Sequence, residues 1–187
     1  MHNAAQYRSD LRRDILAIRA GRDKTLASRQ SLQAQNILLR SASWQNAHFI
    51  ALYMPIRGET DTSLLVKAAL DGGKTLYLPK MLDKTRLVFA KCADPRLLEA
   101  GIYGIPEPPY GDMAEKLDLV IVPGVAFDKR GYRLGYGAGC YDRALAQPNA
   151  SRATFIGLCF KFQTVQDISP QFWDIPMHGI CTEEGLS

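Results

Sequence analysis

The segment from Asp118 to Arg143 constrains the fold of this chain more than any other. It begins with a short run of branched hydrophobic residues, LDLVIVP, whose length and composition are typical of a buried parallel strand. The run ends at Pro123-Gly124, and a loop with glycines at 131, 135, 137 and 139 follows. A segment typical of a helix begins near Gly139. A strand, a glycine-rich loop and a helix in this order predict one unit of an α/β fold.

The glycine-rich loop has two interpretations. Glycines after a buried strand let the chain turn sharply and bring backbone N–H groups close to an anion, which predicts a phosphate-binding loop. Tyr141-Asp142-Arg143 adds a carboxylate and a cation to the same turn. The loop contains no GxxxxGK[ST], and its G-x-G-x-G is close to the dinucleotide pattern GxGxxG without matching it. A glycine-rich surface turn therefore remains the alternative.

Length and composition predict one domain over residues 1–187, because 187 residues with 47% hydrophobic content suit one substantial core. No run approaches the roughly 18 apolar residues of a membrane span, and the start lacks the apolar core of a secretory signal. We expect a cytoplasmic protein that does not enter a membrane. The four cysteines form no CxxC pair, so we expect reduced thiols. Cys140 in the glycine loop is either a reactive thiolate or a small apolar filler.

The order of elements predicts a three-layer α/β/α fold with a mostly parallel, Rossmann-like sheet and two N-terminal helices. The expected helices cover residues 11–18, 25–40, 61–73 and 139–147. The expected strands cover residues 47–55, 74–79, 86–91, 117–123 and 154–160. Residues 94–117 and 162–182 read as mostly irregular. Met54, Glu59, Lys80 and the glycine loop all follow predicted strands, so we expect them at one edge of the sheet. Taken singly, Met54 is better explained as a core filler, Glu59 as a helix-start carboxylate and Lys80 as a solvated charge.

Basic residues gather near the start of the chain, at positions 8, 12, 13, 19, 22 and 24, within a net charge of +4. Such a cluster can bind nucleic acid. Acidic residues at 10, 14 and 23 interrupt it, and no alternation of aromatic and basic residues follows. A helix that turns one or two arginines toward an anionic ligand is the preferred interpretation, and we expect no nucleic-acid partner.

These residues resemble the 5-formyltetrahydrofolate cyclo-ligases, also called methenyltetrahydrofolate synthetases. PGVAFDKRGYRLGYGAGCYDR is similar to the signature PGxAFDxxGxRLGxGxGxYD of that family. Weaker matches occur in the same order at Arg8-Ser-Asp-Leu-Arg12, Gly58-Glu-Thr-Asp-Thr62, Gly104-Ile-Pro-Glu-Pro108, and Asp174-Ile-Pro with Thr182-Glu183. Together they span nearly the whole chain.

The resemblance implies that ATP and Mg²⁺ drive ring closure of 5-formyltetrahydrofolate to 5,10-methenyltetrahydrofolate, with release of ADP and phosphate. ATP would phosphorylate the formyl oxygen, and N10 of the folate would then displace the phosphate. Phosphoryl transfer needs positioning and charge neutralisation more than a covalent nucleophile. The resemblance also favours a monomer.

The resemblance assigns each site residue. Arg133 and Tyr141 are the candidate catalytic residues, and Asp142 and Asp174 the candidate magnesium pair. Met54, Glu59, Tyr103, Tyr136 and Cys140 are expected to contact folate. The expected ATP-binding residues are Arg8, Arg12, Arg133, Leu134, Gly135, Tyr136, Gly137, Ala138, Gly139, Cys140 and Tyr141.

Three departures from the family pattern affect this site. Tyr136 stands where the family commonly has an arginine, and Arg133, Lys80 or Arg143 could offset the lost cation. Cys140 replaces a tyrosine. His178 replaces an acidic residue of the tail motif, and imidazole would suit Mg²⁺ poorly.

Other functional classes remain as alternatives. A non-catalytic folate- or nucleotide-binding homologue would keep the pocket without consuming ATP. An enzyme of related architecture, such as a sugar-phosphate isomerase or a CoA transferase, would not need ATP. Nucleic-acid binding is a more distant alternative, which a salt-dependent interaction with RNA would be needed to support.

Overall fold

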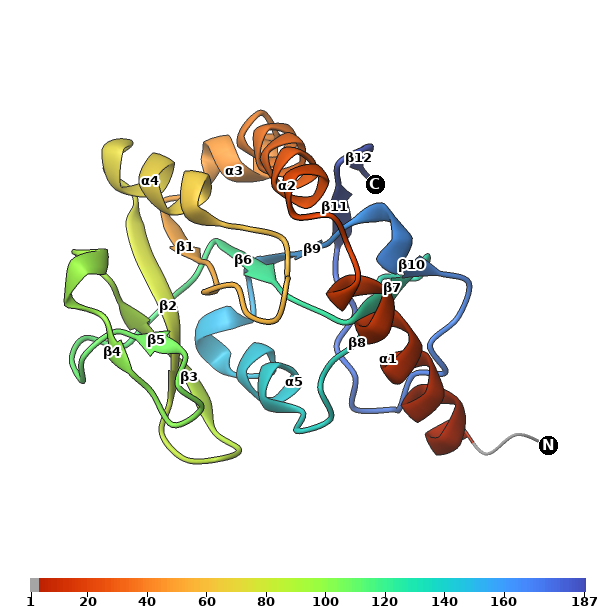
Figure 1. The fold of residues 1–187 in the computed structure, drawn as a ribbon. Helices are drawn as coiled ribbons and strands as arrows, with labels where there is room; N and C mark the ends of the chain where they lie inside the picture. Colours follow the sequence, from red (N-terminus) through yellow and green to blue (C-terminus); the bar gives the residue numbers. More distant parts are fainter. Residues whose placement is uncertain (1–3) are drawn as a thin grey trace.

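A seven-stranded, mostly parallel sheet forms the centre of the computed structural model, which describes residues 4–187 (Figure 1). Its strands, in spatial order, are β12 (Gly185–Leu186), β11 (Gly179–Thr182), β9 (Thr154–Leu158), β6 (Leu119–Val122), β1 (Phe49–Ala51), β2 (Thr75–Met81) and β3 (Leu87–Lys91). The five inner strands pair in parallel, and only the outer strands β12 and β3 are antiparallel. All four residues of β6 are buried, as expected for a strand covered on both faces.

Helices cover both faces of this sheet and confirm the three-layer prediction. α2 (Lys24–Leu39), α3 (Ala42–Asn46) and α4 (Ser63–Asp71) pack on one face, where Leu38, Trp44 and Leu65 contact the apolar side chains of the inner strands. α5 (Cys140–Leu145) packs on the opposite face through Ala144 and Leu145 (Figure 1). The two faces of the sheet therefore have separate hydrophobic clusters.

A smaller sheet and the first helix lie beside the main sheet. β10 (Thr164–Val165), β7 (Ala126–Asp128) and β8 (Arg133–Leu134) form the smaller sheet, on which α1 (Ala4–Ala20) packs (Figure 1). Ile15 of α1 contacts the cluster that contains Val125 and Leu134. The first part of the predicted glycine loop is thus a β7–β8 hairpin, and only residues 135–139 remain as loop.

The tail is more ordered than the sequence suggests. Strands β10, β11 and β12 lie within or just after the segment expected to be irregular, and α3 is a third helix before the sheet. A further two-stranded sheet, β4 (Glu99–Ala100) and β5 (Pro106–Glu107), and the 3₁₀ turns η1 (Pro95–Leu97), η2 (Pro148–Ala150) and η3 (Lys161–Gln163) complete the chain. These elements have two to five residues each, too few for hydrophobic periodicity to show.

The strand order changes direction between β1 and β6. From β1 the chain crosses through α4 to β2 on one side, and from β6 it crosses through α5 to β9 on the other. Such a switch point opens a crevice at the carboxyl ends of the two strands, where open α/β sheets bind ligands.

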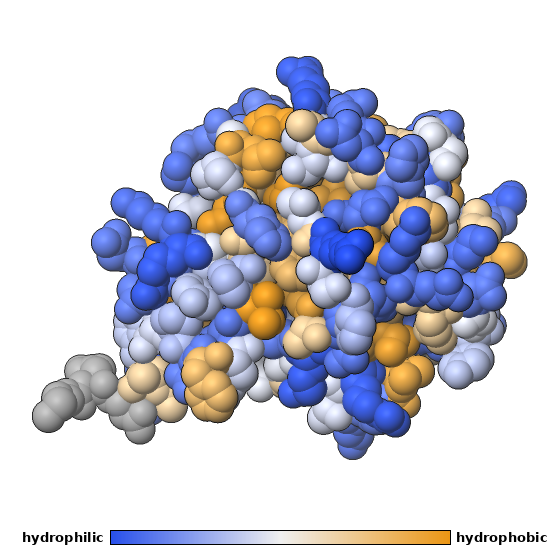
Figure 2. All heavy atoms as spheres, turned by 180° about the vertical axis from the view of Figure 1, so that it is seen from behind, coloured by the Kyte–Doolittle hydropathy of each residue, from blue (hydrophilic) through white to orange (hydrophobic). Residues whose placement is uncertain are grey.

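One face of the molecule is mixed in polarity (Figure 2), and the cysteines are unpaired. On the face seen from behind, hydrophobic side chains appear as separate patches among polar ones (Figure 2). Within residues 4–187, none of the helices is both long and apolar enough for a membrane span. All four cysteines are free thiols.

Candidate active site

A cavity of about 610 Å³ opens at this switch point, a size suited to small molecules. The loops after β1 and β6 supply much of its wall, together with α1 and the tail. Of the residues that the sequence assigns to the site, the cavity is lined by Arg8, Arg12, Met54, Glu59, Tyr103, Arg133, Gly135, Tyr136, Gly137, Ala138, Gly139, Cys140, Tyr141, Asp142 and Asp174. Leu134 is fully buried and packs in the cluster beneath α1 instead.

The loop of residues 135–139 follows α1 closely. The Arg12 Nε donates to the Gly135 carbonyl at 2.8 Å and ties the loop to the helix. Burial, and then the charge of Arg8, lower the pKa of Arg12, so two cations of α1 face the same space. Gly137 and Gly139 have φ values of 111° and 64°, which favour glycine. The loop thus runs along the cavity with a backbone that is not covered by side chains at its glycines, and Arg8 and Arg12 lie beside it.

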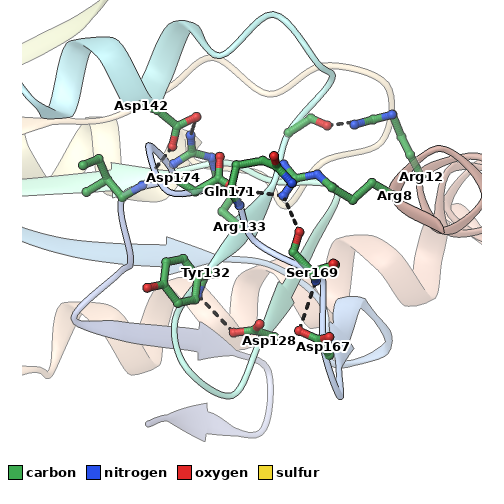
Figure 3. Close-up of polar contacts among 12 residues, drawn as sticks. Arg8, Arg12, Asp128, Tyr132, Arg133, Asp142, Asp167, Ser169, Gln171 and Asp174 are labelled. Carbon is green, nitrogen blue, oxygen red and sulfur yellow. Dashed lines mark hydrogen bonds and ion pairs between the residues drawn. The ribbon is translucent and has the colours of Figure 1, made fainter. Parts of the chain in front are cut away.

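The first of two ion pairs joins α1 to the tail (Figure 3). Arg8 donates to Asp174 at 2.7 Å and to the Ser169 carbonyl at 3.2 Å. The backbone N–H of Gln171 also donates to the Asp174 carboxylate, at 2.9 Å. This network holds the tail against the cavity, and both charged side chains lie mostly out of solvent.

The second ion pair joins β8 to α5 (Figure 3). Arg133 lies 2.8 Å from the Asp142 carboxylate, and the exposed fractions of the two side chains are 3% and 14%. The Arg133 guanidinium also lies over the Tyr141 ring, and its Nη1 is buried with no hydrogen-bond partner. Burial raises the pKa of Tyr141 far above its usual value, so its hydroxyl stays neutral. An unpaired buried donor of this kind suits an acceptor group on a ligand.

A third polar cluster surrounds Tyr136. Its hydroxyl accepts a hydrogen bond from Arg19 at 3.0 Å and donates one to Glu59 at 3.1 Å. The backbone N–H of Ile56 donates to the other Glu59 oxygen, and the Arg57 guanidinium lies over the Tyr136 ring. Burial raises the pKa of Glu59, although these partners lower it. Burial and the charge of Glu59 raise the pKa of Tyr136 to about 12.

Aromatic and apolar side chains close the other side of the cavity. The Tyr103 hydroxyl donates to the Lys84 carbonyl at 2.8 Å, which fixes the ring at the entrance. Met54 is half-buried between the core and the cavity. Cys140 is half-buried on the loop side of the cavity. Trp173, beside Asp174, also lines the cavity, and the sequence offered no periodicity or motif that marked it.

The suggested compensations for the missing loop arginine differ in their placement. Arg133 lines the cavity. Lys80 donates to the Pro108 carbonyl and Arg143 to the Thr85 carbonyl, and neither belongs to the cavity lining. His178 also lies outside it, where its Nδ1 accepts a hydrogen bond from the backbone N–H of Phe155. His178 therefore serves the β9–β11 pairing in this structure.

Arg19 is the main residue that sequence reasoning missed. The sequence shows it only as one of six basic residues near the start of the chain, yet it is 3% exposed and donates a hydrogen bond to Tyr136. A signal was present, since Arg8, Arg12 and Arg19 are spaced by four and seven residues and share one face of a helix with about 3.6 residues per turn.

Two carboxylates at the cavity could hold a metal ion. Within residues 4–187, no group of three or more His, Cys, Asp or Glu side chains gathers at one point. Asp142 and Asp174 line the same cavity, and Asp142 accepts a hydrogen bond from the N–H of Ile175, next to Asp174. Mg²⁺ takes one or two carboxylates and completes its shell with water and phosphate oxygens. Two carboxylates are within the number that Mg²⁺ takes from protein side chains.

Comparison with known proteins gives one consistent result. Residues 4–183 match the 5-formyltetrahydrofolate cyclo-ligase family. A 5-formyltetrahydrofolate cyclo-ligase of Haemophilus influenzae is 31% identical over 94% of this chain and 97% of its own length. The corresponding protein of Escherichia coli K12 is 32% identical over 73% and 78% of the two chains.

Solved structures agree with this result. The 5,10-methenyltetrahydrofolate synthetase of Aquifex aeolicus superposes with a TM-score of 0.84 at 33% identity, over 96% of this chain and 91% of that one. The synthetase of Mycoplasma pneumoniae, at 23% identity and a TM-score of 0.76, shares the fold. The chain is therefore a member of the 5-formyltetrahydrofolate cyclo-ligase family of enzymes.

Proposed function

We propose that this enzyme converts 5-formyltetrahydrofolate to 5,10-methenyltetrahydrofolate and consumes ATP to ADP and phosphate. The observation that carries the proposal is the convergence of Arg8, Arg12 and Arg133 with Glu59 and Tyr103 on one cavity. The arginines suit phosphates. The carboxylate and the aromatic ring suit a pterin.

The arginines would bind the transferring phosphate. The formyl oxygen of an amide leaves poorly, so it takes the γ-phosphate of ATP first; N10 then attacks the activated carbon and phosphate departs. Negative charge on the phosphate oxygens must be neutralised throughout, and positioned cations supply this most effectively where water is excluded. Arg133 is 4% exposed and has an unpaired Nη1, so it is the strongest candidate for this role.

Asp142 and Asp174 would hold Mg²⁺, which would bring further positive charge to the phosphates. Each carboxylate already balances an arginine, Arg133 and Arg8 respectively. A bound cation would compete with the arginines for these carboxylates. The guanidinium N–H groups released in this way could then donate to phosphate oxygens. Tyr141 would keep Arg133 in place through the contact with its ring.

Folate would be held by the residues at the carboxyl end of β1 and at the entrance. Glu59 can accept hydrogen bonds from the cyclic amide N–H and the exocyclic amine of a pterin, as carboxylates do with paired donors. Tyr103 would stack on an aromatic part of folate, and Met54 would provide an adaptable apolar contact. A monomer and a cytoplasmic location complete the proposal, and four free thiols suit a reducing compartment.

ADP release tests the proposal. The purified protein should release one ADP for each methenyl product, and only when Mg²⁺, ATP and 5-formyltetrahydrofolate are all present. An Arg133→Met variant should lose most of this activity, whereas Arg130→Met, in the same hairpin outside the cavity lining, should keep it. Folate binding without ADP release would identify a non-catalytic binding protein and contradict the proposal.

A further inference from the structure

Tyr136 connects two arginines from distant parts of the chain to one carboxylate of the cavity. Its hydroxyl lies 3.0 Å from Arg19 Nη1 and 3.1 Å from Glu59 Oε1. The Arg57 guanidinium lies over its ring, with Cζ 5.3 Å from the ring centroid. The position that commonly holds a loop arginine in this family thus holds a side chain that contacts two arginines in this chain.

Arg19 is fixed in place at the last turn of α1. Its Nη2 donates to the Gly124 carbonyl at 2.6 Å, directly after β6. Gly58 lies next to the aliphatic part of the Arg19 side chain: a methyl group added at Gly58 would lie 3.4 Å from Arg19 Cγ. Arg19 is 3% exposed, so its guanidinium cannot turn away without leaving a buried charge uncompensated. These contacts hold Arg19 Nη1 beside the Tyr136 hydroxyl.

The direction of the hydrogen bonds follows from chemistry. A guanidinium only donates, so the Tyr136 oxygen must accept from Arg19, and the single hydroxyl hydrogen is left for Glu59. Arg19 is itself 3.9 Å from Glu59 Oε1, beyond hydrogen-bond distance. Arg19 therefore acts on the carboxylate directly only as a charge, and the Tyr136 hydroxyl supplies the hydrogen-bonded link between them.

Both Tyr136 and Glu59 line the cavity, whereas Arg19 lies behind them. The second Glu59 oxygen is held by the Ile56 N–H, so both carboxylate oxygens have protein donors. An arrangement that fixes a ligand-facing carboxylate from behind is typical of positioning contacts at binding sites.

We propose that Arg19 and Tyr136 are positioning residues, which hold the Glu59 carboxylate in the one orientation that binds the pterin end of folate. The inference rests on the proposed function, because it takes folate as the ligand of Glu59. It adds a requirement for the Tyr136 hydroxyl, which an arginine in the loop could not meet in the same way since it has no oxygen to accept from Arg19.

Loss of the hydrogen-bonded link changes the titration of Glu59 in a defined direction. Burial raises the pKa of Glu59, while the Ile56 N–H, Arg19, Tyr136 and Arg57 lower it. Two further titratable side chains, Tyr53 and Tyr141, sense its charge and stay neutral. A Tyr136→Phe variant removes one of the lowering contacts, so Glu59 should take up a proton at a higher pH than in the natural chain.

The experiment measures the Kd of 5-formyltetrahydrofolate and of Mg-ATP between pH 5 and 8 for the natural chain, Tyr136→Phe, Arg19→Lys and the double variant. For Tyr136→Phe we expect folate to bind about tenfold more weakly at pH 7, which corresponds to one lost hydrogen bond to a charged group. The pH below which folate binding fails should rise, and the Kd of Mg-ATP should change less than that of folate, because the hydroxyl that the variant lacks donates to Glu59. The double variant should bind folate about as weakly as Tyr136→Phe, because Arg19→Lys keeps the positive charge near Glu59 and the hydrogen-bonded link through the hydroxyl is already lost in Tyr136→Phe.

Tyr132→Phe is the matched control, since Tyr132 lies four residues before Tyr136, in the turn of the β7–β8 hairpin, and outside the cavity lining. Unchanged folate binding in Tyr136→Phe, or equal losses of folate and ATP binding with an unchanged pH midpoint, would overturn the inference. The inference and the proposed function can fail separately: folate binding that depends on Tyr136 without turnover contradicts only the cyclo-ligase reaction.

Discussion

Replacement of Asp142 should affect stability as well as activity, because its carboxylate balances a buried arginine. The pair with Arg133 spans 2.8 Å, and the side chains are 14% and 3% exposed. Removing one partner of a buried pair costs about 3–5 kcal/mol. Asp142 keeps some access to water, so the lower end applies. Loss of the hydrogen bond from the Ile175 N–H overlaps with this cost. We expect Asp142→Ala to lower the free energy of unfolding by about 3 kcal/mol.

An Asp142→Asn variant removes the negative charge of the side chain but keeps its size and shape. The amide oxygen can still accept from the Ile175 N–H, so we expect a loss of about 2 kcal/mol. Natural domains have about 5–15 kcal/mol of stability, so this variant should remain folded. It should nevertheless lose turnover by about 100-fold, since the carboxylate is part of the charge balance around the phosphates. The asparagine variant is thus a cleaner test of catalysis than alanine.

The assay is urea unfolding followed by tryptophan fluorescence, with Trp44 in the core as the main reporter. Arg133→Met removes the other member of the pair, and the double variant completes a thermodynamic cycle. The double variant should be about 2 kcal/mol more stable than the sum of the single losses predicts, because no buried charge is left alone. Additivity within about 0.5 kcal/mol would refute the claim that the two residues form a coupled pair.

Three further replacements test the framework around the cavity by urea unfolding. Gly131→Ala should lose at least about 2 kcal/mol, since φ is +86° and the new methyl would lie 2.3 Å from the Met177 carbonyl oxygen. Gly157→Ala should lose about 1–3 kcal/mol, because its methyl would lie 2.4 Å from the Phe127 ring; Phe127→Leu in the same chain should recover part of it. Asp118→Ala should lose about 1–2 kcal/mol at pH 7, since Asp118 accepts from two backbone N–H groups at the start of β1, and this difference should shrink below about pH 4.

The pH dependence of the Asp118 effect follows from its hydrogen bonds. Burial raises the pKa of Asp118, but the N–H groups of Phe49 and His48 outweigh it, so the pKa is lowered on balance. The stabilisation is therefore complete above the unfolded pKa and is lost as the pH falls through the folded one. Gly135→Ala is the control for the glycine variants, because nothing lies within 4 Å of its new methyl and the stability should not change. A pH-independent Asp118 effect, or a stable Gly131→Ala, would contradict these assignments.

The sequence predicted the centre of this fold because parallel strands leave a strong signal. Residues 119–122 are buried on both faces, and their uninterrupted branched side chains reveal it. The shared edge of the sheet followed from the order of strands and helices, and it correctly placed Met54, Glu59 and the glycine loop at one cavity. Lys80 was expected after a strand that ends at residue 79, but β2 continues to Met81, so Lys80 lies within the strand and its ammonium donates to the Pro108 carbonyl.

The remaining parts depend on contacts between segments far apart in the chain. Asp174 meets Arg8 across more than 160 residues, so only family resemblance could place both at the site before the structure. Arg19 shows the converse, since its helical spacing was visible but a buried arginine cannot be distinguished from a solvated one by spacing alone. β11 has only four residues and is defined by its pairing with β9.

Absorbance of the methenyl product is the most direct test of the central claim. The purified protein is mixed with 5-formyltetrahydrofolate, and the ultraviolet band of the product is followed with and without Mg-ATP. We predict growth of the band only when Mg-ATP is present, with Arg133→Met as the inactive control. A protein that binds the folate but forms no product with Mg-ATP would contradict the proposed reaction.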